Sequence, residues 1–273
     1  MRHRSQFVPW KTAGRITEQQ HSADEVVRAT GWVFNNETGS SLTLEEFVAT
    51  GDDEVPAYIE IFGLADGGDD LTLVEIGCGI GRMTCAFTRR FASVVACDLD
   101  AGFLERCHET VARFGNVDRL ATLHVKDGKS LDLPPNSADV AFSYITFQHC
   151  DVDDALDLTA EAVRVVRPGG KVALNYRSRS SIDPLVLPLG RVVRQLFRIP
   201  GLGTWLSRRR TAARIGWQAN RLQPDEIIRP LAPLLRDIEV WRNPSSRTSG
   251  RRATVREFVG INENHYWIVA TAR

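Results

Sequence analysis

A glycine-rich stretch from Val74 to Gly81 has residue types that suit the binding of a nucleoside cofactor. It reads Val-Glu-Ile-Gly-Cys-Gly-Ile-Gly, which places Gly77, Gly79 and Gly81 directly after an apolar run. Without a Cβ, glycine lets the backbone approach a ligand closely, and a helix that begins at such a turn presents free N–H groups to it. A tight strand-to-helix turn also uses glycine for steric reasons alone, so the stretch needs a second feature before it defines a site.

Asp98 is that second feature, because it ends the next apolar run of the chain. In nucleotide-binding α/β sheets, an acidic residue at this place binds the ribose hydroxyls. The same residue would also suit the N-cap of the following helix, but its position after an apolar strand favours the ribose role. The loop and the acid together predict a nucleoside cofactor.

Glu75 and the glycine spacing distinguish between two such cofactors. Dinucleotide enzymes use G-x-G-x-x-G so that a helix N-terminus can hold the pyrophosphate, whereas here the third glycine comes one position early. A carboxylate at Glu75 would repel a pyrophosphate and attract a ligand that carries an ammonium and a sulfonium group. The pattern therefore favours S-adenosylmethionine over NAD.

The elements that position these residues alternate between strand and helix from Leu71 onward. Such alternation is typical of βαβ units, and it predicts an α/β, Rossmann-like, doubly wound and mostly parallel sheet of seven strands. We expect an N-terminal arm with cap helices over 1–70, broken at Gly51-Asp52-Asp53, and a cofactor-binding core over 71–177. A helical lid inserted after the fifth strand follows over 178–215, and the region 216–273 completes the sheet.

Several segments resemble the class I S-adenosylmethionine-dependent methyltransferases, in particular the small-molecule enzymes of domain types 11 and 25. Val74 to Thr84 resembles their motif I, and Val95 to Asp100 resembles their ribose-binding segment. Lys126 to Gly128 and the turn and strand at 133–140 are similar to their adenine-binding loop and fourth strand. The segment 147–172 matches the approach to their fifth strand. The resemblance is close over 71–177 and loose over 215–273.

The resemblance implies a role for each matching residue. The loop glycines would face the methionine part of the cofactor, Asp98 would hold both ribose hydroxyls, and Asp127 would bind the adenine amino group. Asp127 also fits a simple turn residue. The expected cofactor site comprises Glu75, Gly77, Gly79, Gly81, Asp98, Leu99, Asp127, Gly128 and Ser143.

His149 is the candidate catalytic base, because it follows the fourth strand at the edge where ligands gather in an open α/β sheet. Oxygen acceptors need such a base, whereas a neutral amine or an activated carbon does not. The alternative, which we weigh slightly higher, is that His149 only caps the next helix or shapes the pocket. Acceptor contacts are assigned to Trp32, Phe34, Tyr144 and Arg177.

The lid segment interleaves arginine with apolar residues and contains one acid, Asp183. This pattern is typical of an amphipathic lid. One interpretation is a clamp for an acidic or lipid-like acceptor drawn from a membrane surface. The other, which the zero net charge of the whole chain favours, is a solvated helix pair whose arginines bond to the acidic stretch from Glu45 to Asp70.

Bulk properties narrow the function further. The formal net charge is zero, so no global field attracts nucleic acid, and no nucleic-acid module or base-methyltransferase loop is visible. Five cysteines without a C-x-x-C pair predict neither a disulfide framework nor a metal site, and they fit a reducing cytoplasm. No apolar run is long enough for a transmembrane segment.

These features predict an enzyme that transfers a methyl group from S-adenosylmethionine to a small molecule by in-line displacement, with an oxygen acceptor slightly favoured. The alternatives are a nicotinamide-dependent oxidoreductase and a non-catalytic cofactor-binding protein on the same fold. The intact motif residues argue against the latter.

Overall fold

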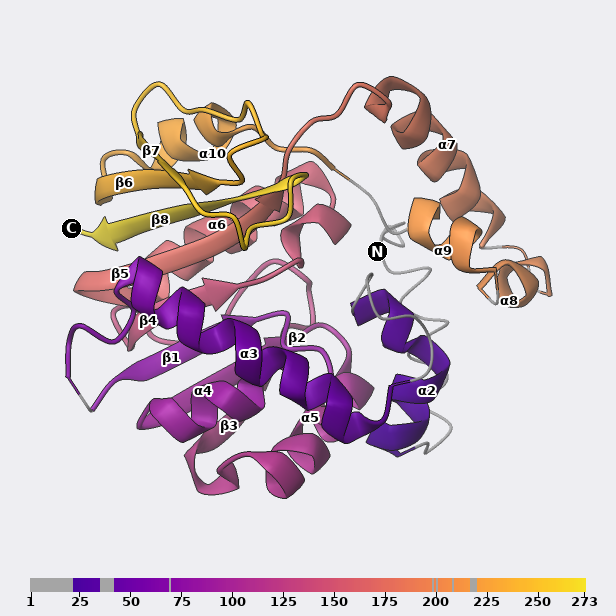
Figure 1. Cartoon of the computed structure of the whole chain (residues 1–273), viewed down its shortest axis with the longest axis horizontal. Coiled ribbons are helices and arrows are strands. Elements are labelled where there is room, and N and C mark those ends of the chain that lie inside the picture. The colour runs from indigo at the N-terminus through magenta and orange to yellow at the C-terminus, as the bar shows by residue number, and fades with distance from the viewer. Residues whose placement is uncertain are drawn as a thin grey trace.

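A computed structural model of the chain describes residues 22–34, 42–68, 70–197, 199, 201–207, 209–216 and 220–273. At its centre lies one sheet with the strand order β3-β2-β1-β4-β5-β8-β6-β7 (Figure 1). Neighbouring strands from β3 to β5 run parallel, and β8 runs antiparallel to both β5 and β6. The strands are β1 (Thr72–Ile76), β2 (Ser93–Asp98), β3 (Leu120–His124), β4 (Ala138–Ser143), β5 (Val166–Arg177), β6 (Leu235–Arg242), β7 (Thr254–Glu257) and β8 (His265–Ala272). The predicted Rossmann-like fold class is confirmed.

The number of strands differs from the prediction, because the sequence predicts seven and the described chain has eight. The additional strand is β7, which pairs with β6 in parallel at the edge of the sheet. All four of its residues are exposed. Strands are found in a sequence by their buried apolar positions, so an edge strand without any leaves no such pattern.

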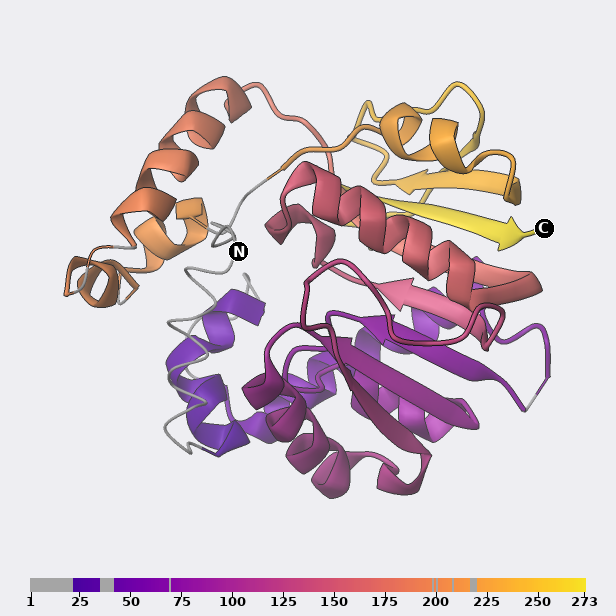
Figure 2. The same ribbon diagram turned by 180° about the vertical axis from the view of Figure 1, so that it is seen from behind.

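Helices cover both faces of the sheet (Figures 1 and 2). On one face α6 and α10 pack on a core that includes Val74 and Tyr176. On the other face α3 and α4 pack on Phe142 and Trp267. The helices are α2 (Ala23–Phe34), α3 (Leu44–Phe62), α4 (Thr84–Arg90), α5 (Ala101–Phe114), α6 (Val152–Val165), α7 (Asp183–Leu196), α8 (Leu202–Ser207), α9 (Arg210–Gly216) and α10 (Pro224–Leu231), with short 3₁₀ turns η1 (Val117–Arg119) and η2 (Phe147–His149).

The predicted break between the second and third helices is wrong, because α3 runs without interruption from Leu44 to Phe62. It begins at the predicted capping box of Thr43 and Glu46. Gly51 is needed for packing rather than as a helix stop. A Cβ on Gly51 would lie 2.2 Å from the carbonyl oxygen of Arg82, so this glycine lets α3 contact the loop that follows β1.

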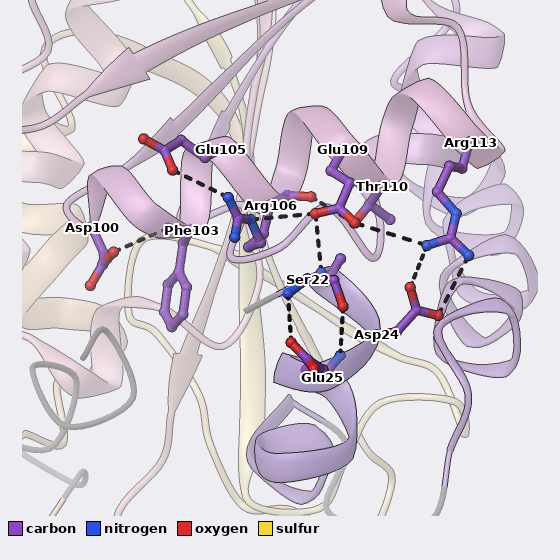
Figure 3. A network of polar contacts seen from close by, with 11 residues as sticks. Ser22, Asp24, Glu25, Asp100, Phe103, Glu105, Arg106, Glu109, Thr110 and Arg113 are labelled. Carbon is purple, nitrogen blue, oxygen red and sulfur yellow. Dashed lines mark hydrogen bonds and ion pairs between the residues drawn. The ribbon is translucent and has the colours of Figure 1, made fainter. Parts of the chain in front are cut away.

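The helix α2 is held against α5 by polar contacts, which Figure 3 shows. The backbone N–H of Ala23 donates to the carboxylate of Glu109 at 3.1 Å, and Asp24 forms an ion pair with Arg113. The buried side chains of Val26 and Val27 pack beside Phe103 of α5. These contacts fix α2 near the end of β2. Trp32 and Phe34 lie in its last turn, but their side chains fall outside the described part of the structure.

The carboxyl ends of the parallel strands point to the side of the molecule where α2 and the helices α7 to α9 lie (Figures 1 and 2). Parallel α/β sheets bind ligands at this edge. Among the described residues, no helix combines the length and the apolar character that crossing a membrane requires.

Candidate cofactor and acceptor site

One cavity lies at the carboxyl ends of β1, β2 and β4, where the strand order reverses. Together with the open solvent at its mouth, it encloses about 1110 Å³. A reversal of strand order is where doubly wound sheets bind their ligands, because the connections on either side leave to opposite faces. The residues of the predicted site that line this cavity are Glu75, Gly77, Gly79, Asp98, Leu99, Gly128, Tyr144 and His149.

The glycine loop forms the floor of the cavity, and its glycines are required by geometry. Gly77 has φ of +80°, a conformation that residues with a side chain rarely adopt. A Cβ there would lie 2.2 Å from the hydroxyl oxygen of Thr146, which follows β4. The loop is also bonded to β2, since the N–H of Gly77 donates to the carbonyl of Cys97 at 2.7 Å. Gly77 therefore lets the ends of β1 and β4 meet under the cavity.

Two backbone N–H groups hold the carboxylate of Asp98, one from the glycine loop and one from the turn after β2. One carboxylate oxygen accepts from the N–H of Gly79 at 2.9 Å, and the other accepts from the N–H of Asp100 at 3.0 Å. Asp100, not Asp98, caps α5 by accepting from the N–H of Phe103 at 3.1 Å. Because Asp100 is the N-cap of α5, Asp98 does not have the capping role that its sequence position also allowed. Its carboxylate faces the cavity.

Glu75 is buried at the end of β1, and the hydroxyl of Thr84 donates to it at 2.6 Å. Burial, partly offset by Thr84 and Arg82, raises the pKa of Glu75 to about 7. Burial also raises the pKa of Asp98 to about 6. Two carboxyl groups that lose water in one cavity are stabilised in their ionised form by a cationic ligand. The electrostatics of the cavity therefore suit a positively charged guest.

Four predicted residues lie outside the cavity lining, and local contacts explain each position. Gly81 packs on α5, where a Cβ would lie 3.2 Å from the sulfur of Cys107. Ser143 is buried and donates to the carbonyl of Ile76 at 2.9 Å, which ties β4 to β1. Asp127 accepts bonds within its own loop, including the hydroxyl of Ser130 at 2.6 Å. Arg177 ends β5.

His149 and Tyr144 line the cavity beyond β4. His149 lies in η2, where the amide nitrogen of Gln148 approaches its Nε2 at 3.3 Å. The contact with Gln148 therefore orients the His149 ring at the wall of the cavity. Tyr144 stacks on the indole of Trp267 with 5.4 Å between ring centroids. A titratable imidazole and an aromatic wall therefore share the cavity with the two carboxylates.

Several cavity residues were not found from the sequence. Arg82 is buried and forms a two-point ion pair with Glu54 of α3, at 3.0 and 3.3 Å. Ile145 has φ of +53°, an outlier for a β-branched residue, and its N–H donates to the side chain of Asn175 at 3.3 Å. Strained backbone of this kind gathers at functional sites. These contacts join distant parts of the chain, so no local pattern reveals them.

The described residues contain no group of three or more His, Cys, Asp or Glu side chains that could hold a metal ion. The five cysteines are free and buried. Their thiols are small apolar core groups, and burial raises the pKa of the Cys97 thiol. The cavity therefore draws its chemistry from carboxylates, backbone N–H groups and one imidazole.

Comparisons with known proteins agree with this geometry. Residues 74–174 match the methyltransferase domain family. A malonyl-[acyl-carrier protein] O-methyltransferase of Salmonella typhimurium is 32% identical over 45% of this chain and 45% of its own length. A demethylmenaquinone methyltransferase of Thermobifida fusca is 34% identical over 43% of this chain and 48% of its own length. The chain thus spans about half the length of these curated relatives.

A solved structure shares the fold over most of the chain. The magnesium protoporphyrin IX methyltransferase of Synechocystis, determined with bound S-adenosylhomocysteine, has a TM-score of 0.53 and covers 92% of this chain and 97% of its own, at 14% identity. At that identity the likeness shows the fold alone. The family match and the curated relatives identify residues 74–174 as a methyltransferase domain that uses S-adenosylmethionine.

Proposed function

We propose that the protein transfers the methyl group of S-adenosylmethionine to an oxygen atom of a small-molecule acceptor. The observation that carries this proposal is that His149 lines the same cavity as Glu75 and Asp98. An imidazole takes up a proton near neutral pH, which an oxygen nucleophile must lose as it attacks. The name of one relative supports an oxygen acceptor, since that protein is a malonyl-[acyl-carrier protein] O-methyltransferase.

The residues of the cavity fit the cofactor. When bound, S-adenosylmethionine supplies an electrophilic methyl group on a positively charged sulfur. Asp98 would accept hydrogen bonds from the ribose hydroxyls, because it lines the cavity and two backbone N–H groups fix its carboxylate. Glu75 would face the cationic end and Gly77 and Gly79 the methionine backbone. Asp127, Gly128, Leu99 and Ser143 are proposed to hold or frame the adenosine.

The protein's remaining task is to hold the acceptor in line with the methyl group and to exclude water. Tyr144 offers an aromatic wall for it, held by Trp267, Tyr58 and the Arg82 guanidinium, which lies 5.6 Å from the ring centroid. The His149 imidazole would take the acceptor proton as the nucleophile attacks. Trp32, Phe34 and Arg177 remain proposed acceptor contacts.

Replacing His149 by asparagine tests the base. We expect kcat for oxygen acceptors to fall by about 10²-fold or more, which is the usual contribution of a general base. Affinity for S-adenosylhomocysteine should stay within about twofold, because the base contacts the acceptor and not the nucleoside. The measurement is transfer of labelled methyl groups to a panel of carboxylate, phenol, amine and activated-carbon acceptors.

The matched control is His108→Asn, since His108 is exposed on α5. It should leave both turnover and affinity unchanged. Equal turnover by the His149 variant, or transfer to amines alone, would contradict the proposed base and the proposed acceptor atom.

A further inference from the structure

The helix α7 carries an exposed apolar stripe. Ile182, Leu185, Leu189 and Val192 have exposed fractions of 60, 78, 49 and 56%. Their spacing of three, four and three residues places them on one side of the helix. Ile199 and Trp205 continue the exposure beyond α7. Six of the ten large exposed apolar side chains of the described residues thus lie between 182 and 205, so the exposure is concentrated and not scattered.

The opposite side of α7 is the one that packs on the protein. Its buried residues include Gly190 and Arg194, and Arg194 donates to the carbonyl of Gly216 at 3.3 Å. A Cβ on Gly216 would lie 2.9 Å from the ring of Phe197, so α7 and α9 meet closely there. The apolar stripe therefore takes no part in the packing of α7 on α9.

Charge is segregated into the same segment. Residues 178–216 contain eight arginines and one acid, a formal charge of +7, while the whole chain has none. The single acid, Asp183, is buried and pairs with Arg221 at 3.2 Å. The guanidinium of Arg209 lies 4.8 Å from the ring centroid of Trp205. The rest of the chain carries the balancing −7, so this segment is a strongly basic pole.

The sequence favours pairing of these arginines with the acidic stretch 45–70, and the described side chains give ion pairs for some members of both groups. In that stretch Glu54 pairs with Arg82, and Asp52 pairs with Arg89. Of the lid arginines, Arg179 pairs with Glu226 of α10. These ion pairs connect the acids of the α3 region to the sheet domain, and among the described side chains of the basic pole Arg179, Arg191 and Arg209 are exposed.

We propose that the segment 178–216 docks on an anionic lipid surface. The stripe on α7 would enter the boundary between headgroups and acyl chains, and the arginines would lie among the lipid phosphates. This combination of an apolar face with arginines and a tryptophan is the pattern by which interfacial helices bind membranes without spanning them. Neither the apolar stripe nor the charge alone would favour a lipid surface over a protein partner.

The basic pole is attached firmly to the methyltransferase domain. The ion pair between Asp183 and Arg221 connects the beginning of this segment to the chain that follows it. Beyond it, the side chain of Asn220 donates to the carbonyls of Phe147 and Cys150, at 2.7 and 2.6 Å. Both carbonyls flank His149. Docking would therefore fix the lipid surface at the same end of the sheet as the cavity, although the docking itself does not depend on the methyl transfer.

The test is co-sedimentation of the full chain with phosphatidylcholine vesicles, with and without phosphatidylglycerol. We expect binding at low salt to the anionic vesicles, little binding to neutral ones, and loss of binding as salt is raised. The double variant Leu185→Ser, Leu189→Ser should bind at least about tenfold more weakly, because two apolar side chains leave the membrane. Both residues are exposed, so their replacement should not disturb the fold.

The matched control is Leu234→Ser with Val259→Ser, whose side chains are 53 and 80% exposed elsewhere on the protein. It should bind as the parent does. A charge variant, Arg191→Glu with Arg209→Glu, should lose the preference for anionic lipid. Absence of binding at low salt, or unchanged binding by the double serine variant, would overturn the proposal. A dimer in solution that the serine variant dissolves would also overturn it and assign the stripe to a second copy.

Discussion

Replacing Asp98 by asparagine should weaken binding of S-adenosylhomocysteine by about a hundredfold or more. An amide offers one acceptor oxygen in place of two, and it loses the charge that strengthens bonds from the ribose hydroxyls. Bonds to a charged group contribute about 1.5–3 kcal/mol each, so losing one bond and the charge on the other amounts to roughly the 2.7 kcal/mol that corresponds to a hundredfold. Isothermal titration calorimetry measures the change directly.

The control for this result is Asp100→Asn, two residues away. Asp100 caps α5 through a bond from Phe103, and asparagine is an equally good N-cap, so affinity and stability should both be retained. If Asp98→Asn bound the nucleoside as well as the parent, the ribose assignment would be wrong. If both variants lost binding, the loop as a whole and not the carboxylate of Asp98 would be responsible.

Replacing Glu75 by glutamine should raise the stability of the ligand-free protein while it weakens cofactor binding. The raised pKa of Glu75, about 7 against 4.5 when unfolded, means that the folded protein holds an additional proton between these pH values. The ligand-free parent therefore loses stability as pH rises through this window. Glutamine removes that cost, and at 1.36 kcal/mol per pKa unit we expect a gain of about 3 kcal/mol at pH 8. Thermal unfolding at pH 5 and pH 8 measures it.

The same Glu75 variant should bind the cationic cofactor at least about tenfold more weakly at pH 8, because an uncharged amide no longer attracts the ammonium and sulfonium groups. In the parent, affinity should fall as pH drops through 7 and 6, where Glu75 and then Asp98 gain protons. Glu60→Gln, an exposed change on α3, is the matched control. A Glu75 variant that loses stability at pH 8 while binding normally would show that the carboxylate serves the fold alone.

The parts of the fold that the sequence predicts are those with local signals. The helix α5 has a local signal at each end, since Asp100 caps it and Gly115 follows it. The alternation of buried strands with amphipathic helices predicts the order of β1 to β5. Gly77, Gly79 and Asp98 line the cavity, and each is found in the sequence by its distance from the end of an apolar run.

The remaining features depend on contacts between distant residues. Gly51 interrupts the helical pattern in the sequence, yet its role is to contact the backbone of Arg82, 31 positions along the chain. The strained backbone of Ile145 depends on the side chain of Asn175, which neighbouring residues do not predict. The carboxylate of Asp127 accepts hydrogen bonds from Lys129 and Ser130 of its own loop. The role of Asp127 as an adenine ligand therefore depends on the sequence resemblance alone.

The crystal structure of the protein with S-adenosylhomocysteine would test most directly whether this cavity is the cofactor site. We expect both ribose hydroxyls within hydrogen-bonding distance of the Asp98 carboxylate. The sulfur should lie over Gly77 and Gly79, with its methyl-bearing side open toward His149. Adenosine bound elsewhere, or a ribose that leaves Asp98 without contact, would contradict the account.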